Sequence, residues 1–292
     1  MPLILDKSMP VYSLLEAEDP TLLADHMPDD TLHLLLFNLM SDKIQTELQY
    51  LRCLGTAKQY IHVEFLRQVS YTSARQDAAY LEKYYLTERD NAHKHYDALL
   101  ITGAPLEYIT CEDTLYWEEF CRIMQWSKTH VKSTFAGCWG AFAAIHWDYD
   151  VAKTNLPVKL SGIYALQCHM PQEPLFQGLS QPLLIPLSRA TDMDRQAVDQ
   201  CSQLIMLACT PSGSPVFLKS ADNRYIYCTG HPEYELNRLA DEYARDKDKE
   251  KAWVCPMPDN YFSNNDPNQP PVDTWTAQGQ QLFRNWISHY VV

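Results

Sequence analysis

The feature that most constrains this chain is the stretch STFAGCWGA at residues 133–141. Small and apolar residues of strand type lead up to Cys138, and helix-compatible residues follow it directly. Ala136 and Gly140 lie two positions before and after the cysteine. A strand that turns sharply into a helix strains the backbone and brings the two elements close together, so its neighbours must be small. The stretch therefore predicts a nucleophile elbow that presents Cys138 above a sheet.

A cysteine at such a turn has one chemical interpretation and one structural alternative. The helix that follows Cys138 directs its N-terminus at the sulfur, and the positive end of the helix dipole favours the thiolate. However, free cysteine is also among the most buried residue types, so a packed side chain at a strand end is the competing interpretation. Whether Cys138 is reactive or merely packed depends on whether the rest of the chain contains a base and hydrogen-bond donors for it.

In the first half of the chain, apolar runs of strand length alternate with helical patterns. Such runs are typical of strands buried on both faces, and they are found at 31–40, 62–66, 96–102 and before Cys138. Helices are expected at 43–54, at 113–130 with Asp113 or Thr114 as the cap, and at 139–149. The polar, Tyr-rich segment 73–94 is expected to combine a helix with a loop. This alternation predicts an α/β three-layer sandwich with a mostly parallel sheet, whose sites lie at the carboxyl ends of strands.

The second half of the chain has more strands and fewer helices. Short strands that can extend the sheet in the antiparallel sense are expected at 159–166, 183–187, 204–210, 216–218 and 225–229. Helices are expected from the 230–234 turn to about 245, and over 275–290. Residues 1–30 are interpreted as an N-terminal arm with a short helix near 11–17, and residues 31–292 as a single domain.

Charge and hydropathy argue against two classes of protein. The chain of 292 residues has 24 basic and 37 acidic residues and a formal net charge of −13. Nucleic-acid binding needs a basic footprint, and the sequence has no basic run. No apolar run approaches the ~20 residues that cross a bilayer, and the N-terminus does not have the pattern of a signal peptide. We therefore expect a cytoplasmic protein that binds neither nucleic acid nor membrane.

The cysteines indicate a reducing compartment. There are nine, an odd number, and none forms a C-x-x-C pair. Their spacing predicts neither a zinc site nor a disulfide framework.

A cysteine nucleophile needs a base, and the base needs a group that orients it. His231 and Glu233 are the candidates, because they follow a strand that ends at the same sheet edge as Cys138. An extended His-Pro-Glu segment can turn the imidazole and the carboxylate toward one another. The alternative is an ordinary turn in which Glu233 caps the next helix.

The oxygen of an acyl intermediate at this thiol needs hydrogen-bond donors, which backbone N–H groups can supply. One donor would be the N–H of Trp139, directly after the nucleophile. The other would come from Ala104, in the Gly103-Ala104 turn at the end of the 96–102 strand.

A series of motifs carries a resemblance to a known family. They are NLM-x-x-K at 38–43, TGAPLE at 102–107, CWGA at 138–141, KLSGIY at 159–164, SR at 188–189, TGHPEY at 229–234, EYARD at 242–246, NYF…NDP at 260–267 and F-x-NW at 283–286. With these motifs the chain resembles the homoserine O-acyltransferases of methionine biosynthesis. That family is a branch of the class I glutamine amidotransferase-like fold, which is flavodoxin-like. The resemblance runs from about residue 32 to the C-terminus.

The resemblance implies acyl transfer in two steps, by a single acyltransferase domain at 31–292. Cys138 would carry the acyl group as a thioester, His231 would be the base, and Glu233 would be its partner. The donor would be acetyl-CoA as a co-substrate, and the acceptor would be homoserine. No metal or bound cofactor would be needed, and the family tends to form homodimers.

The resemblance also implies residues that select the substrates. Lys159 and Arg245 would bind the amino-acid acceptor, Arg245 through the acceptor's carboxylate, and Ser188 would influence specificity. Glu107 would influence the choice of donor, since glutamate at this position goes with acetyl and glycine with succinyl. A fixed carboxylate there would repel the carboxylate of a succinyl group.

Four departures from the family pattern leave the acceptor open. The chain has Ser41-Asp42 for the usual Pro-Lys, Phe142 for glutamine, Leu187 for histidine and Ser263 for proline. If Phe142 and Leu187 line the pocket, they would favour an acceptor less polar than homoserine or of a different shape. Serine or a specialised metabolite is therefore an alternative acceptor. Two different functions also stay open, a glutamine amidotransferase-like cysteine hydrolase and an inactive binding protein on the same scaffold.

Overall fold

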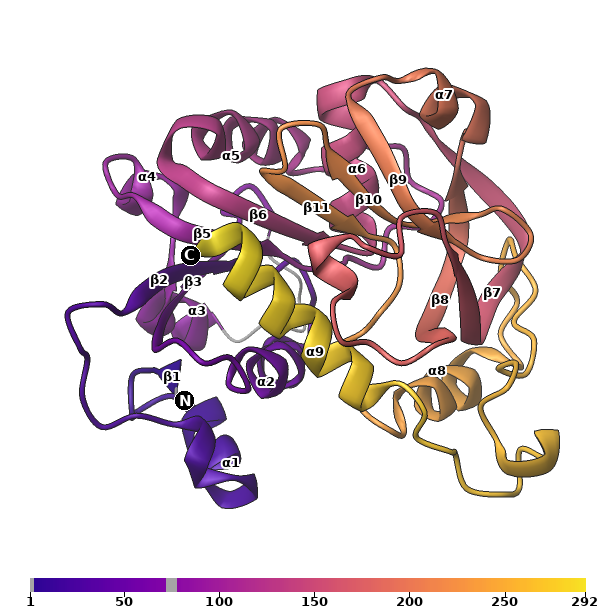
Figure 1. Ribbon diagram of the computed structural model, residues 1–292, viewed down its shortest axis with the longest axis horizontal. Coiled ribbons are helices and arrows are strands. Elements are labelled where there is room, and N and C mark those ends of the chain that lie inside the picture. The colour runs from indigo at the N-terminus through magenta and orange to yellow at the C-terminus, as the bar shows by residue number, and fades with distance from the viewer. Residues whose placement is uncertain (1–2, 72–77) are drawn as a thin grey trace.

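A computed structural model describes residues 3–71 and 78–292. In this part of the chain, eleven strands form one twisted sheet (Figure 1). Six strands run parallel in the spatial order β1 (Leu3–Ile4), β3 (Ile61–Leu66), β2 (Leu32–Phe37), β5 (Tyr96–Ile101), β6 (Val131–Gly137) and β11 (Tyr225–Cys228). The sheet continues through antiparallel strands β10 (Pro215–Ser220), β9 (Leu204–Cys209), β7 (Lys153–Cys168) and β8 (Leu183–Met193). The short β4 (Tyr85–Leu86) pairs with β3.

Helices cover both faces of this sheet, so the predicted α/β three-layer architecture is confirmed (Figure 1). The α-helices are α1 (Pro10–Glu18), α2 (Lys43–Leu54), α3 (Ala78–Tyr84), α4 (Glu88–Asn91), α5 (Trp117–His130), α6 (Trp139–Tyr149), α7 (Arg195–Gln200), α8 (Arg238–Asp246) and α9 (Thr276–Trp286). Three 3₁₀ turns, η1 (Pro20–Leu22), η2 (Pro174–Phe176) and η3 (Ser263–Asn265), and a π-helical end, η4 (Ile287–Val291), complete the chain. Residues 73–77 of the expected helix-and-loop segment lie outside the described residues.

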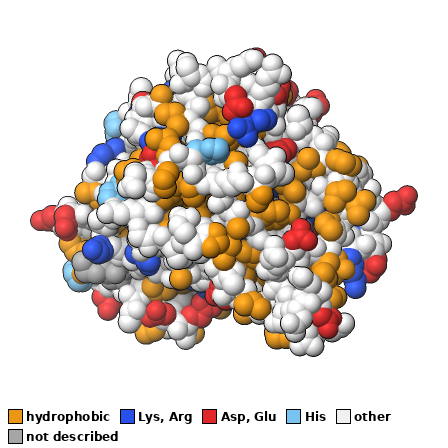
Figure 2. All heavy atoms as spheres, turned by 45° about the vertical axis from the view of Figure 1, so that its right-hand side comes forward, with side chains coloured by type: hydrophobic (Ala, Val, Ile, Leu, Met, Phe, Trp, Pro, Cys, Tyr) orange, Lys and Arg blue, Asp and Glu red, His pale blue; other side chains and the backbone are white. Residues whose placement is uncertain are grey.

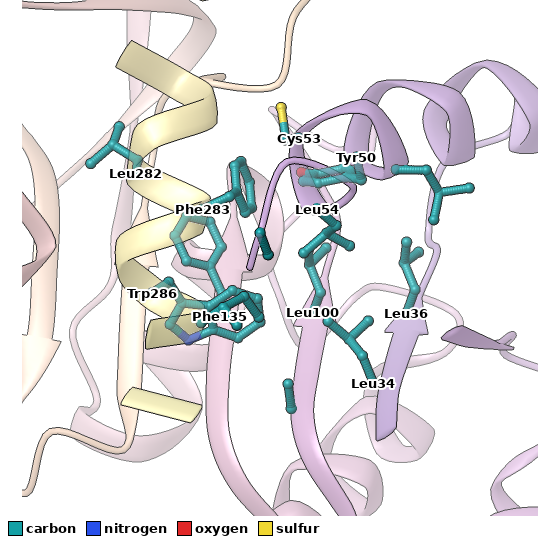
Figure 3. Packing of buried hydrophobic residues seen from close by; sticks show 14 of the residues in the cluster. Leu34, Leu36, Tyr50, Cys53, Leu54, Leu100, Phe135, Leu282, Phe283 and Trp286 are labelled. Carbon is teal, nitrogen blue, oxygen red and sulfur yellow. The ribbon is translucent and has the colours of Figure 1, made fainter. Parts of the chain in front are cut away.

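Alternation along the central strands explains the layers. In β2, Leu34 and Leu36 point to one core, and Leu35 and Phe37 point to the other. Successive residues of a strand face opposite sides, so a strand that is apolar at every position must be covered on both. Figure 3 shows the first of these cores, where side chains of α2 and α9 meet the apolar side chains of β2, β5 and β6. Helices α5 and α6 cover the opposite face.

Two helices begin later than the sequence pattern predicts. Helix α5 begins at Trp117, because the side chains of the expected caps are engaged in the preceding loop. Asp113 Oδ2 accepts from the Thr110 hydroxyl at 2.7 Å, and the Thr114 hydroxyl donates to the Thr110 carbonyl at 3.1 Å. Helix α8 begins at Arg238, several residues beyond the 230–234 turn.

Strands β7 and β8 are longer than the strands expected at 159–166 and 183–187. They form an antiparallel hairpin, and a second stretch of pairing joins 153–155 to 191–193. Backbone hydrogen bonding, which does not depend on side-chain polarity, therefore extends both strands.

The surface is mixed in character. On the face seen in Figure 2, acidic side chains are dispersed and apolar ones cover much of the middle. Within residues 3–71 and 78–292, no helix has both the length and the apolar character needed to span a membrane.

Candidate active site

The turn between β6 and α6 has the predicted elbow geometry. Strand β6 ends at Gly137, helix α6 begins at Trp139, and Cys138 between them has φ 46° and ψ −119°. Its backbone N–H donates to the carbonyl of Cys228 on the neighbouring strand β11 at 2.7 Å. A positive φ in a residue other than glycine is strained, and such strain persists only where the surrounding structure enforces it. The thiol is partly exposed at the carboxyl end of the parallel strands.

Two glycines allow close packing around Cys138: Gly140 in helix α6 and Gly103 in the turn after β5. A Cβ added to Gly140 would lie 2.7 Å from the carbonyl oxygen of Thr102, a distance that real Cβ atoms essentially never show. A Cβ added to Gly103 would lie 3.0 Å from Cys138 Cβ and 3.5 Å from its sulfur. The turn after β5 therefore packs directly against the thiol, because Gly103 has no side chain.

The proposed oxyanion donors border the same point. The backbone nitrogen of Trp139 lies 3.8 Å from the position that a Cβ on Gly103 would occupy. As the first residue of α6, Trp139 has an N–H without an acceptor inside the helix. Ala104 follows Gly103 and is buried. The structure thus brings the two predicted backbone segments together beside the thiol.

His231 and Glu233 are brought together as predicted. His231 Nδ1 and Glu233 Oε1 lie 2.7 Å apart, and both side chains are buried. The backbone N–H of His231 donates to the Pro186 carbonyl at 2.8 Å, and the ring of Tyr234 stacks on the imidazole with centroids 4.0 Å apart. The ring is therefore fixed by a carboxylate at its edge, an aromatic face and its own backbone.

The charge on His231 depends on its two neighbours. Burial disfavours the imidazolium, but the Cys138 sulfur and the Glu233 carboxylate outweigh burial and raise the pKa of His231 to about 10. This arrangement keeps His231 as an imidazolium at neutral pH, next to the Cys138 sulfur. A cation beside a cysteine is the setting in which enzymes activate a thiol as a nucleophile.

A second buried cluster lies beside His231, and the sequence motifs did not single out its central residue. Glu242 of α8 accepts from Lys159 Nζ at 3.1 Å, from the Tyr234 hydroxyl at 2.9 Å, and from the Ser188 hydroxyl. We call Lys159, Ser188, Tyr234 and Glu242 the Glu242 network. Glu242 is part of the EYARD motif, but nothing in its local sequence indicates burial or its partners, which come from three other segments.

Electrostatics fix Glu242 as an anion. Burial alone would favour the neutral acid, but Lys159, the Ser188 hydroxyl and Arg238 outweigh it and lower the pKa of Glu242 to about 2. Lys159 also lies over the ring of Trp253, with its ammonium 5.5 Å from the ring centroid. Tyr234 joins the two clusters, since it stacks on His231 and donates to Glu242.

Arg245 is not in direct contact with this network. It lies one turn beyond Glu242 on α8, its side chain is 51% exposed, and its guanidinium donates to both carboxylate oxygens of Asp246 at 2.9 and 2.6 Å. Glu107 lies in the loop after β5, whose Leu106 and Glu107 carbonyls accept from Lys153 Nζ.

Phe142 and Leu187 belong to the hydrophobic core. Both are buried, in the two opposite cores of the sheet. The ring of Phe142 lies under the guanidinium of Arg189, 5.5 Å from the centroid. Their positions give no support to the interpretation that they alter the acceptor pocket.

The cysteines are not joined to one another. All nine are free thiols. In the described part of the chain, no group of three His, Cys, Asp or Glu side chains is arranged to hold a metal ion.

Comparisons with known proteins identify the family to which the sequence is similar. The family described as homoserine O-succinyltransferase matches residues 2–292. The chain is 38% identical to a homoserine O-acetyltransferase of Methanomassiliicoccus intestinalis, a match that covers 100% of this chain and 95% of the relative. It is 34% identical to a homoserine O-acetyltransferase of Geobacillus kaustophilus, with 100% and 97% covered. It is 32% identical to a homoserine O-succinyltransferase of Pseudoalteromonas translucida, with 100% and 93% covered.

Solved structures show the same fold at low sequence identity. A glutamine amidotransferase of Thermotoga maritima superimposes with a TM-score of 0.54 at 8% identity, covering 89% of this chain and 98% of that one. This likeness confirms the predicted glutamine amidotransferase-like fold. Since the family match and the full-length identities rest on the whole sequence, the chain belongs to the homoserine O-succinyltransferase family.

Proposed function

We propose that the protein is an acyl-CoA-dependent homoserine O-acyltransferase that forms a thioester on Cys138 and uses acetyl-CoA as its donor. The observation that carries the proposal is the strained elbow thiol beside the buried His231–Glu233 pair, in a chain similar over its full length to homoserine acyltransferases. Covalent catalysis divides one difficult transfer into two easier ones.

In the first half-reaction, the Cys138 thiolate attacks the thioester carbonyl of acyl-CoA. The oxygen of the tetrahedral intermediate accepts hydrogen bonds from the backbone N–H groups of Trp139 and Ala104. The bond from the carbonyl carbon to the CoA sulfur then breaks, and the His231 imidazolium gives its proton to the departing CoA thiolate. The products are free CoA, the acyl-enzyme and a neutral imidazole.

In the second half-reaction, neutral His231 takes the proton of the homoserine hydroxyl as that oxygen attacks the acyl carbon. The bond to Cys138 breaks, the ester leaves, and the thiolate–imidazolium pair is restored. Glu233 stabilises the imidazolium in each cycle through its hydrogen bond to Nδ1. The cycle uses protein groups and two substrates, and it needs no metal and no resident cofactor.

The Glu242 network and Arg245 are proposed to bind the amino-acid acceptor. Lys159 and Ser188 belong to this network, beside the base that must receive the hydroxyl proton. Glu242 offers an anion that could face the acceptor's ammonium group, and Arg245 offers a cation for its carboxylate. Glu107 supports acetyl rather than succinyl as the transferred group.

The remaining features of the proposal concern the whole chain. Residues 31–292 would form the acyltransferase domain, and residues 1–30 an arm whose strand β1 pairs with β3. The enzyme would work in the cytoplasm, as a homodimer. Sedimentation of the purified chain tests the oligomeric state.

The decisive experiment follows the acyl-enzyme. Incubated with acetyl-CoA alone, the protein should gain one acetyl group by intact mass, and L-homoserine should then remove it and yield O-acetylhomoserine. Cys138→Ala should abolish the adduct and lower turnover by about 10³-fold or more. Cys121→Ala, at another partly exposed thiol, is the control and should keep both.

A panel of substrates identifies the donor and the acceptor. Acetyl-CoA and succinyl-CoA are each tested with L-homoserine and L-serine, and transfer from acetyl-CoA to L-homoserine should be the fastest of the four reactions. Glutamine hydrolysis without acyl transfer would contradict the proposal.

A further inference from the structure

A hollow of about 330 Å³ opens at the carboxyl edge of the sheet, on the β3–β2–β5 side of Cys138. We call it the apolar groove. Its walls include Leu39 after β2, Gln68 after β3 and Leu106 after β5, together with Ile109, Leu115 and Tyr116 from the loop before α5. The two half-reactions of the proposed mechanism give no role to any of these side chains.

The wall of the groove contacts the segment that packs against the thiol. The backbone N–H of Leu39 donates to the Thr102 hydroxyl at 2.8 Å, and Thr102 precedes Gly103, which packs against Cys138. The groove wall and the elbow are thus joined through adjacent residues. The Glu242 network is built from other elements, α8 and the β7–β8 hairpin, so the groove and the network share no residue.

The rim of the groove is apolar and exposed. Ile109 is 43% exposed and Leu115 is 73% exposed, the highest value among the exposed large apolar side chains of the described residues. Scattered exposed apolar residues are ordinary, but here they border one concave site beside a reactive group. That combination is typical of ligand sites, which are mostly apolar with a few polar groups.

One buried polar atom of the groove wall lacks a partner. Gln68 is only 4% exposed, and its Oε1 accepts no hydrogen bond from the residues that the structure describes. A buried amide oxygen without a donor is unfavourable, and native structures rarely retain one without a reason. A ligand that brings an N–H group into the groove would satisfy it.

We propose that the apolar groove binds the pantetheine arm of acyl-CoA, and that Gln68 Oε1 accepts a hydrogen bond from an amide N–H of that arm. The arm is a narrow chain of aliphatic segments and two amides that ends in the reacting sulfur. Its apolar segments would pack against the aliphatic walls, and one of its amide N–H groups would donate to Gln68 Oε1. Its terminal sulfur, which carries the acyl group, must reach Cys138. This inference rests on the proposed function, because it identifies where that function's donor lies.

The test compares a donor that carries the arm and its amides with a donor that has neither. Acylation of Cys138 is measured with acetyl-CoA and with the acetyl thioester of a simple alkanethiol, which has no amide. Gln68→Leu keeps the side chain's approximate size and removes the acceptor. It should lower kcat/KM for acetyl-CoA by about tenfold relative to kcat/KM for the simple thioester.

A second pair of variants tests whether the apolar rim of the groove binds CoA. The two substituted side chains are equally exposed. Ile109→Asp places a carboxylate in the groove, whereas Leu14→Asp makes the same change on α1, and both positions are 43% exposed. Ile109→Asp should weaken the binding of free CoA, measured by calorimetry on Cys138→Ala protein, by about tenfold or more. Leu14→Asp should leave it unchanged.

The outcomes separate this inference from the proposed function. If wild-type protein forms no acetyl adduct from acetyl-CoA, the proposed function fails. If it forms the adduct, but Gln68→Leu affects both donors equally and Ile109→Asp binds CoA as Leu14→Asp does, the groove is not the donor site. In that case the acyltransferase function stands and this inference is overturned.

Discussion

The two sides of the Cys138 site, the Glu242 network and the apolar groove, differ in how their buried polar groups are hydrogen-bonded. On the α8 side, the Glu242 network holds a buried carboxylate with an ammonium and two hydroxyls, all supplied by the protein. On the β2–β5 side, the apolar groove exposes aliphatic side chains, and the Gln68 oxygen has no donor within residues 3–71 and 78–292.

This contrast follows from what each flank is proposed to bind. A small zwitterion is recognised by charge, and a buried charge is tolerated only when it is paired and hydrogen-bonded. A long and mostly apolar arm gains affinity from the area that it buries, and it needs few polar contacts. We therefore expect the Glu242 network to respond strongly to the loss of one member, and the donor side to respond mildly.

The largest effect is expected from Lys159→Met. It removes the ammonium from the buried Glu242 carboxylate and leaves Arg238, with Nε 3.3 Å from Oε1, as the remaining cation. The free energy of unfolding should therefore fall by up to about 3–5 kcal/mol, measured by urea denaturation at pH 7. The double variant Lys159→Met/Glu242→Gln should recover most of that loss, because it also removes the buried charge that Lys159 neutralised.

Lys219→Met is the matched control for that experiment. It breaks another buried ion pair, with Glu173 at 2.7 Å, on strand β10. It should lower stability similarly while the folded protein keeps its acceptor KM. Equal KM changes in both single variants would remove the distinction between the network and an ordinary buried pair.

The next effect is a pH dependence of stability. The pKa of Glu242 is lowered from 4.5 to about 2, so the carboxylate stabilises the fold fully above its ordinary pKa and loses that contribution as pH falls toward 2. The stability advantage of wild type over Glu242→Gln should therefore shrink by up to about 3 kcal/mol between pH 5 and pH 2. Denaturation curves at several pH values measure it, with Glu250→Gln in the exposed 247–251 loop as control. If the stability difference between wild type and Glu242→Gln does not change with pH, Glu242 is not the buried carboxylate with a lowered pKa.

On the donor side, Glu107→Gly should shift the preference toward succinyl-CoA. Removing one repulsive carboxylate is worth about 1–3 kcal/mol, or about 5- to 150-fold in the ratio of kcat/KM values for the two donors. Glu107→Gln removes the charge but keeps the size, so comparing the two variants separates repulsion from crowding. Wild-type protein that already prefers succinyl-CoA would argue against the role of Glu107.

The smallest effect is expected at Arg245. Its guanidinium is half-exposed and already engaged by Asp246, so Arg245→Lys should raise the acceptor KM by only about 3- to 10-fold. Acylation of Cys138 by acetyl-CoA should be unaffected, because the acceptor enters afterwards. A slower acylation step would place Arg245 on the donor side instead.

Local sequence signals predicted the elements that make the elbow. Helix α2 is expected at 43–54 and is found there, and the strand before Cys138 ends at the elbow as expected. His231 and Glu233 could be paired in advance because they are two residues apart, and the 2.7 Å contact needs only a local turn. Phe142 and Leu187 could not be placed, since apolar residues suit a pocket wall and a core equally well.

The sequence by itself determined the layers of the fold and the elbow at Cys138. The mostly apolar runs of β2 and β5 place buried side chains on both faces of the sheet and so require cover on both, and the small residues around Cys138 allow a tight strand-to-helix turn.

Only the tertiary structure decided which groups surround Cys138. Lys159 and Glu242 are 83 residues apart, and their meeting depends on how the β7–β8 hairpin and α8 pack together. The apolar groove likewise arises where the ends of three separate strands converge. Local patterns cannot encode such contacts, because a buried charge or an unpaired amide is defined by its neighbours in space and not by those along the chain.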